Sequence, residues 1–304
     1  MTPAEVRTLV EAEYIPIALL GRAASTVTAH RREVERFADW CDTAGRLDPF
    51  IDSTVAAYLA HLLAGGARPA TANKARALIL AWWRFAHGRR YLDSLPRVPS
   101  CPSRRTIPRA WTVEELGRIF AAASDTPGLV GSSPAGQWWS TLHLWLWETG
   151  ERLAASLANR WEWSALADDR LTFSVPADAR KGGKPAIYRL SANVSAAMLG
   201  IAPRPRTGPV WPFPWCRAIF YRHYGDLLER AGVDRAGRAG PHQMRRAMAS
   251  HLAASQGAAA ARAALGHAND ASTARYLDPR ICGGVSFADH LPAITPARPA
   301  TNTP

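Results

Sequence analysis

The sequence has few cysteines, and their spacing gives them no shared task. Its 304 residues include only four, and no two of them form a C-x-x-C pair or another spacing typical of a metal site. They stand apart at Cys41, Cys101, Cys216 and Cys282. This scatter excludes a disulfide framework and indicates free thiols of a protein in a reducing cytoplasm.

Long apolar runs are also absent. No stretch is long enough to cross a bilayer, and the N-terminus lacks the apolar core of a signal peptide. The chain contains no P-loop, no H-E-x-x-H motif and no acidic cluster suited to Mg²⁺. We therefore expect no membrane partner, no metal, no nucleotide and no other cofactor.

Acidic residues are outnumbered by basic ones. Asp and Glu total 25 against 37 Lys and Arg, which gives a formal net charge of +12. Such an excess favours a polyanionic partner, with nucleic acid as the first candidate. A hydrophobic fraction of 47% and twelve tryptophans exclude a mainly disordered chain. The length suits two domains of ordinary size, each able to bury a core.

The segment from Pro241 to Pro279 carries the most informative pattern. His242 and Arg245 stand three residues apart, so on a helix they share one face and can reach a common target. Met244 and Met248, at four-residue spacing, give the same helix an apolar side to bury. We expect Gly257 to end this helix.

Two further short helices are expected after it. An alanine-rich helix should run to Leu265, because Gly266 stands where a left-handed C-cap residue belongs. His267 follows outside that helix. A third helix should carry Tyr276 and end at Pro279. Residues that commonly cap a helix N-terminus precede it at Asn269, Asp270 and Ser272.

These residues resemble the signature of the tyrosine recombinases, or phage-integrase family. That signature reads H-x-x-R, then L-G-H, then a tyrosine nine residues after the second histidine, and the 242–276 segment matches it in order and spacing. Upstream, the stretch Thr149–Arg152 resembles the T-G-x-R box of the same family. Two departures stand out: Glu151 replaces a usually apolar residue, and Ala155 stands where an acid is often found.

The resemblance implies a site-specific DNA recombinase of the integrase type. In it, Tyr276 attacks a phosphodiester to give a 3′-phosphotyrosyl intermediate, and His242 accepts the phenolic proton. Arg152 and Arg245 bind the non-bridging oxygens, a task for which bidentate guanidinium groups suit the extra charge of the transition state. His267 donates a hydrogen bond to a phosphate oxygen.

A β-hairpin is expected to supply the general acid for the leaving 5′ oxygen. Residues Leu171–Val175 and Ala186–Leu190 read as two strands joined by a basic turn. The resemblance assigns the acid to a lysine of this turn, and Lys181 matches the family pattern best. Lys184 and Arg180 are competitors, and Arg180 is also a candidate DNA contact.

The first hundred residues predict a bundle of three or four amphipathic helices. Their order resembles the SAM-like core-binding domain of integrases, and Lys74 and Arg76 are candidate DNA contacts. The following stretch, Arg97–Ala110, holds three prolines and four arginines and reads as a linker. In it, Arg104 and Arg105 are placed to follow phosphates. A capping box at Thr112–Glu115 opens the second domain.

The expected helix starts in the bundle rest on capping residues. Ser25 or Thr26 should begin the first long helix, whose apolar residues recur at three-to-four spacing from Val27 to Cys41. Ser53 or Thr54 should begin the second, and Thr71 the third.

We thus predict a mainly α (α+β) protein: a helical bundle, then a mostly helical catalytic domain with a small antiparallel sheet. The predicted parts are a core-binding domain (1–96), a linker (97–110), a catalytic domain (111–291) and a disordered tail (292–304). The implied partner is double-stranded DNA with an inverted-repeat recombination site. The protein should be monomeric in solution, tetrameric on paired sites, cytoplasmic and nucleoid-associated.

Two other functions share parts of this pattern. A DNA-binding relative that aligns DNA without cutting it is disfavoured, because such a protein has no use for Tyr276. A type IB topoisomerase shares the chemistry, but the small size of the chain and its integrase-like bundle favour recombination.

Overall fold

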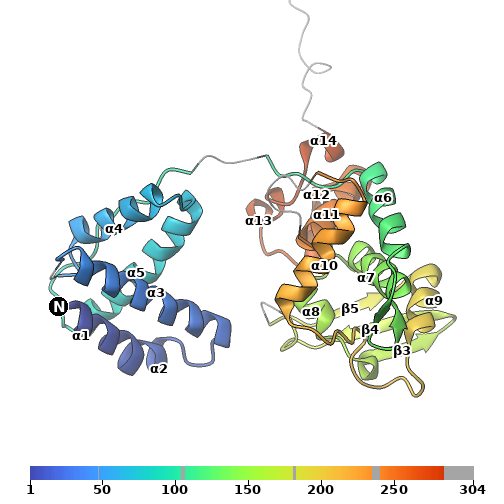
Figure 1. The fold of residues 1–304 in the computed structure, drawn as a ribbon, viewed down its shortest axis with the longest axis horizontal. Coiled ribbons are helices and arrows are strands. Elements are labelled where there is room, and N and C mark those ends of the chain that lie inside the picture. The colour runs from blue at the N-terminus through green and yellow to red at the C-terminus, as the bar shows by residue number, and fades with distance from the viewer. Residues whose placement is uncertain (47, 104–106, 181–182, 235–239, 284–304) are drawn as a thin grey trace, which may run out of the picture. The chain divides into compact units, whose positions relative to one another are not determined.

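The computed structural model describes residues 1–46, 48–103, 107–180, 183–234 and 240–283. It divides into two compact units, Met1–Thr106 and Ile107–Pro304 (Figure 1). Helices dominate both units, and the strands form two small antiparallel sheets in the second. The predicted mainly α (α+β) fold class is confirmed. None of the described helices combines the length and apolar character that crossing a bilayer requires.

The first unit is a helical bundle. It consists of α1 (Pro3–Thr8), the π-helical segment η1 (Leu9–Tyr14), α2 (Ile15–Ala18), α3 (Ala24–Thr43), α4 (Asp52–Ala64) and α5 (Pro69–Gly88). The predicted apolar face of α3 is buried, and Phe37 packs its ring 4.9 Å from that of Tyr58 on α4. Trp82 of α5 completes this core and donates through Nε1 to Nδ1 of the buried His30 at 2.9 Å.

The three predicted helix starts in the bundle are wrong by two or three residues. Each helix begins before the proposed cap, and the residue at each N-cap position makes no side-chain hydrogen bond to the helix. Pro69 is the reason in α5: it takes the first helical position, where the N–H it lacks is not needed. In α4, the acidic Asp52 occupies the first turn, where it suits the helix dipole.

Residues that follow α5 pack back onto the same bundle. Val98 is buried in its core. Arg76 donates to the Val98 carbonyl, and Asn73 exchanges two hydrogen bonds with the backbone of Cys101 at 2.7 and 2.9 Å. Residues 98–101 of the predicted linker are therefore fixed along α5.

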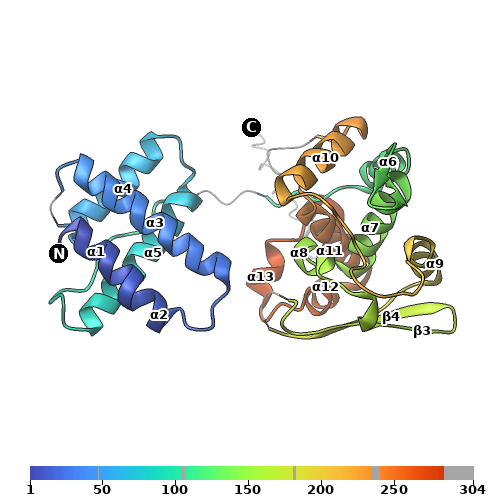
Figure 2. The same cartoon turned by 60° about the horizontal axis from the view of Figure 1, so that its bottom comes forward.

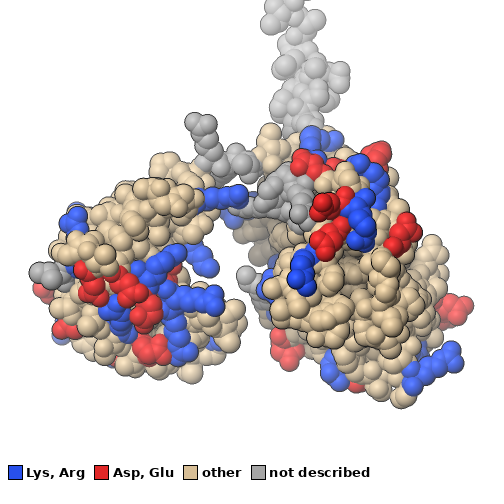
Figure 3. All heavy atoms as spheres, viewed as in Figure 1, with Lys and Arg blue, Asp and Glu red and all other residues tan. Residues whose placement is uncertain are grey.

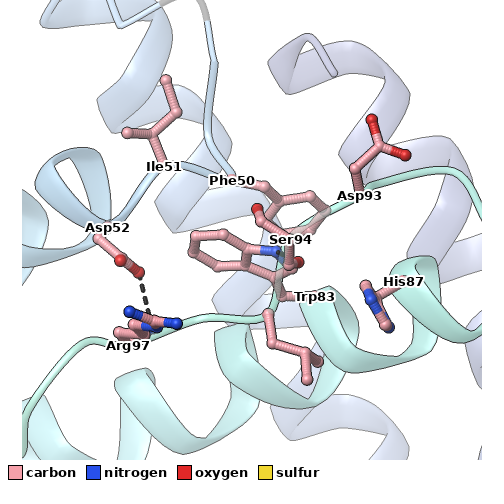
Figure 4. A pocket seen from close by; sticks show the side chains of 9 residues that line it. Phe50, Ile51, Asp52, Trp83, His87, Asp93, Ser94 and Arg97 are labelled. Atoms are coloured by element: carbon pink, nitrogen blue, oxygen red, sulfur yellow. Dashed lines mark hydrogen bonds between the residues drawn. The ribbon is translucent and has the colours of Figure 1, made fainter.

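An open hollow of about 680 Å³ lies beside this segment (Figure 4). Trp83 and Phe50 stack at its floor, with ring centroids 5.6 Å apart. Asp52 borders it and accepts the backbone N–H of Arg97 at 2.8 Å. The hollow contains none of the predicted catalytic residues.

The second unit holds the remaining elements (Figure 2), and its core is rich in tryptophan. Its helices are α6 (Val113–Ser124), α7 (Ala135–Thr149), α8 (Leu153–Leu157), η2 (Trp161–Trp163), α9 (Ala192–Ile201), α10 (Arg217–Arg230), α11 (His242–Gln256), α12 (Ala258–Leu265), α13 (Asp270–Ala274) and α14 (Pro279–Cys282). The capping box predicted at Thr112 and Glu115 is confirmed. Trp138, Trp145 and Trp161 are almost wholly buried.

The predicted hairpin is confirmed, and the sheet is larger than predicted. Strands β4 (Arg170–Val175) and β5 (Ala186–Arg189) pair antiparallel, and β3 (Ser164–Ala167) adds to the other edge of β4. A separate two-stranded ribbon joins β1 (Leu129–Val130) to β2 (Ser133–Pro134).

Candidate active site

The signature segment folds as three consecutive helices whose ends meet. α11 begins at His242, Gly257 ends it, and α12 runs to Leu265. Gly266 adopts the predicted left-handed conformation, with φ of 64°. This cap turns the chain so that His267 leaves the helix at once.

The third helix is shorter than predicted. Asn269, one of the three expected caps, is the N-cap residue of α13. The helix ends at Ala274, so Tyr276 lies in the turn that follows. Pro279 does not end this helix; it is the first residue of α14, which Asp278 caps. A residue before proline avoids the helical region, so the chain has to leave the helix before Asp278.

Tyr276 lies between two histidines. Its ring centroid is 5.1 Å from that of His242 and 4.9 Å from that of His267. The guanidinium carbon of Arg245 stands 5.7 Å from the same centroid. Four of the six predicted catalytic residues are thus brought together, although they come from α11 and from two separate turns.

Arg245 is buried and connects the ends of two helices. Nη1 donates to the carbonyl of Gly150, which caps α7, and Nη2 donates to the carbonyl of Leu265 at 2.7 Å. Its side chain is 1% exposed, yet Nε has no hydrogen-bond partner among the described residues. A buried, unpaired N–H beside a tyrosine suits an anionic ligand.

Arg152 joins the same site from the turn after α7. Gly150 ends that helix with φ of 57°, and Arg152 is the N-cap residue of α8. Burial lowers the pKa of Arg245 and the charge of Arg152 lowers it further, while the nearby Tyr276 and Glu151 oppose the shift. The Arg152 charge also contributes to the lowered pKa values of His242 and His267.

Both histidines are held neutral at pH 7. Partial removal from water, together with the charges of Arg246, Arg245 and Arg152, lowers the pKa of His242 to about 4. Partial burial, followed by the two arginines, lowers that of His267. A neutral imidazole can accept a proton from a phenol, and it can also donate one N–H to a phosphate oxygen. Nδ1 of His267 lies 3.2 Å from Oγ1 of Thr273.

The backbone around Tyr276 is fixed by two buried residues that sequence reasoning missed. Ser250, on α11, donates to the Tyr276 carbonyl at 3.2 Å and accepts the N–H of Asp278 at 2.9 Å. Asp278 is fully buried and in turn accepts the N–H of Ala110 at 2.7 Å. The bond from Ser250 to Tyr276 and the bond from Asp278 to Ala110 join distant parts of the sequence, so no local motif indicates them.

Glu151 is the third buried residue that sequence reasoning missed, since the sequence showed it only as a departure from the family pattern. Its carboxylate accepts hydrogen bonds from the backbone N–H of Arg152 at 2.8 Å and from Nε of Arg180 at 2.6 Å. The hydroxyl of Tyr188, on β5, is a third donor to it. The first predicted general acid, Lys181, lies outside the described residues, and its competitor Lys184 is exposed.

The candidate DNA contacts differ in their surroundings. Lys74 is exposed on α5, while the side chain of Arg76 is bound to the Val98 carbonyl. The side chain of Arg180 is 11% exposed and paired with Glu151. Arg104 and Arg105 lie outside the described residues.

Basic and acidic side chains are mixed on the viewed face of the first unit (Figure 3). Within this unit Arg7 contacts three carboxylates, and Arg31 is paired with Glu11. The partners of Arg7 are Glu35, Asp39 and Asp42. Several basic groups of this unit are therefore already neutralised within the molecule. Within the described ranges, no three His, Cys, Asp or Glu side chains are grouped as metal ligands.

The chain is similar over most of its length to known recombinases, although no family model matches it. It is 30% identical over 274 residues to the tyrosine recombinase XerD of Caulobacter vibrioides, an alignment that covers 84% of this chain and 86% of that protein. A lambda integrase dimer (residues 75–356) bound to a COC′ core site superposes with a TM-score of 0.67 at 17% identity, covering 92% and 96% of the two chains. A lambda integrase tetramer bound to a Holliday junction gives 0.63 at 16%, covering 91% and 81%.

Proposed function

The chain belongs to the tyrosine recombinase family, as a site-specific DNA recombinase of the integrase type, and we propose that Tyr276 is its nucleophile. The observation that carries this assignment is the placement of the Tyr276 ring between His242 and His267, beside the guanidinium of Arg245. Family membership predicts a nucleophilic tyrosine, and this tyrosine is the one that these three groups surround.

The phenol has to lose its proton as it attacks. Its ordinary pKa is about 10, so it is protonated in neutral solution. We assign the proton to His242, which is neutral at pH 7 and packs against the ring. As the Tyr276 oxygen bonds to phosphorus, the bond from phosphorus to the 5′ oxygen breaks, and the DNA 3′ end stays attached to the protein.

The transition state carries more negative charge on its non-bridging oxygens than the substrate does. We assign the binding of these oxygens to Arg245, Arg152 and His267. Their hydrogen-bond donors are fixed by the protein, so no solvent has to rearrange as the charge develops. Two backbone carbonyls hold Arg245 in place. Its Nε–H has no partner among the described residues, so it can donate to a ligand.

The leaving 5′ oxygen needs a proton, which we assign to a lysine of the β4–β5 hairpin. Lys181 is the first candidate and Lys184 the second. Because the phosphotyrosyl bond retains the energy of the cleaved bond, a 5′ hydroxyl from another duplex reverses the step and joins new strands. This reversal returns the proton to Tyr276, and the reaction consumes no water.

We further propose that this protein acts on double-stranded DNA carrying an inverted-repeat site, as a monomer that assembles into a tetramer on paired sites. Four strands are broken in recombination and each active site holds one Tyr276, so four protomers are required. The lambda integrase tetramer on a Holliday junction supports this arrangement. Lys74, Arg104 and Arg105 are the proposed phosphate contacts, while Arg76 and Arg180 hold neighbouring segments. Such a protein would be cytoplasmic and nucleoid-associated.

A nicked suicide substrate tests the nucleophile, because loss of the short 5′ fragment traps the covalent complex. Tyr276→Phe should bind DNA and form no adduct, since it lacks the attacking oxygen. Tyr221→Phe is a matched control: this tyrosine is 39% exposed on α10, and its hydroxyl accepts a hydrogen bond from Arg217 of the same helix. A Tyr276→Phe protein that still forms the adduct would show that another residue attacks.

A further inference from the structure

Glu151 is a buried carboxylate that accepts three hydrogen bonds from different parts of the second unit. It lies between Gly150, whose carbonyl binds Arg245, and Arg152, and its side chain is 0% exposed. One carboxylate oxygen accepts the Arg152 N–H at 2.8 Å. The other accepts from Arg180 at 2.6 Å and from Tyr188 at 2.5 Å. Burial raises the pKa of Glu151, but these donors outweigh it and lower the pKa, so the group is ionised at neutral pH.

Arg180 connects Glu151 to the turn of the β4–β5 hairpin. While Nε binds Glu151, Nη1 donates to the carbonyls of Lys184 and Pro185 at 3.0 and 3.3 Å. Nη2 donates to the Tyr188 hydroxyl at 3.2 Å, and the guanidinium carbon lies 5.9 Å from the ring of that tyrosine. One guanidinium therefore ties the first side of the turn to its second side, and both sides to Glu151.

This arrangement is costly as a purely structural device. A buried ion pair contributes little net stability, and apolar side chains of similar volume often replace such a pair without loss. An apolar residue at position 151 would fill the same space without the cost of burying a charge. What an apolar residue cannot do is link the backbone of Arg152 to the hairpin through directional hydrogen bonds.

We propose that Glu151 is a positioning residue that fixes Arg180 and Lys184, the described ends of the β4–β5 turn, relative to the turn that carries Arg152. This inference rests on the proposed function. The turn between Arg180 and Pro185 carries both candidate acids, so loosening the anchor should move the proton donor away from the leaving oxygen.

Glu151→Gln is the sharpest perturbation. The two carboxylate oxygens accept from donors on opposite sides, and glutamine has only one oxygen to offer. Whichever way the amide turns, its NH₂ group faces an N–H or O–H donor. Glu148→Gln is the matched control. Glu148 lies three residues earlier, and its carboxylate binds the backbone N–H and hydroxyl of Ser191 at the start of α9.

The test compares two nicked substrates, one with the natural 5′ bridging oxygen and one with sulfur at that position. Sulfur leaves as a thiolate without a proton, so it does not need the general acid. Glu151→Gln should slow adduct formation about tenfold to hundredfold on the oxygen substrate and stay within a few-fold of wild type on the sulfur substrate. Arg152→Ala should be slow on both, and Glu148→Gln should match wild type on both.

The remaining outcomes each have a meaning. An equal loss on both substrates would overturn the inference, because Glu151 would then serve the fold or Arg152 alone; a wild-type rate on both would overturn it too. If Glu151→Gln fails to fold, Tyr188→Phe carries the same test, since it removes one donor and keeps the ring. An absence of adduct with the wild-type protein would instead refute the proposed function.

Discussion

Replacing Gly150 by alanine tests how the end of α7 packs against α11. Gly150 caps α7 in the left-handed conformation, with φ of 57°. A Cβ atom added there would lie 1.9 Å from Cε of Met248, far inside van der Waals contact. Gly266 is a matched control: it caps α12 with φ of 64°, and an added Cβ would meet nothing within 4 Å.

The two substitutions share one cost and differ in another. Both force alanine into the left-handed region, which costs about 1 to 2 kcal/mol. Only Gly150→Ala also overlaps a neighbour, and because Met248 has a flexible side chain, the overlap should add the low end of overpacking costs, about 1 kcal/mol. The free energy of unfolding should therefore fall by about 2 to 3 kcal/mol for Gly150→Ala and by about 1 to 2 kcal/mol for Gly266→Ala.

Urea unfolding of the full chain measures these losses. Met248→Ala and the double variant complete a cycle: once Cε is absent, the cost of Gly150→Ala should fall to that of Gly266→Ala. Gly150→Ala should also slow adduct formation, since its carbonyl holds Arg245. Equal costs at the two glycines, or an extra cost that persists beside Met248→Ala, would refute the packing argument.

Two further predictions concern stability. Burial lowers the pKa of His143 to about 4, so as the pH falls below about 6.5 the unfolded state takes up this proton first. Stability relative to His143→Phe should thus fall by about 3 kcal/mol between pH 7 and pH 4, and parallel urea midpoints would contradict this. Gly136→Ala should cost about 3 kcal/mol, because its Cβ would lie 2.0 Å from the Ser124 carbonyl oxygen. At Gly117, in α6, an added Cβ would meet nothing within 4 Å, so Gly117→Ala should raise the free energy of unfolding by up to about 1 kcal/mol. Urea midpoints of the two glycine variants that shift in the same direction would contradict this pair of expectations.

Local patterns in the sequence account for much of the second unit. The three-residue spacing of His242 and Arg245, and the glycine after Leu265, are properties of a single helix, so the backbone follows them directly. The capping box at Thr112 and Glu115 is equally local. α9 was missed although it carries such a signal, since Ser191 caps it.

The anchors of the site could not be predicted in this way. Glu151 meets Arg180 across 29 positions of sequence, and Asp278 meets Ala110 across 168. No periodicity links such pairs, because only the packed fold brings them together. Strand β3 was missed for another reason: three of its four residues are exposed, so it lacks the alternation that marks a half-buried strand.

The bond between Asp278 and Ala110 joins the last described helix of the second unit to its first residues. Ala110 ends the predicted linker, and Asp278 stands two residues after Tyr276. A displacement of the linker that reaches Ala110 has to break this buried bond or move Asp278. Because Ser250 holds the Tyr276 carbonyl and the Asp278 N–H together, the tyrosine backbone would move as well. The backbone of the proposed nucleophile is therefore coupled to Ala110 through one carboxylate and one serine.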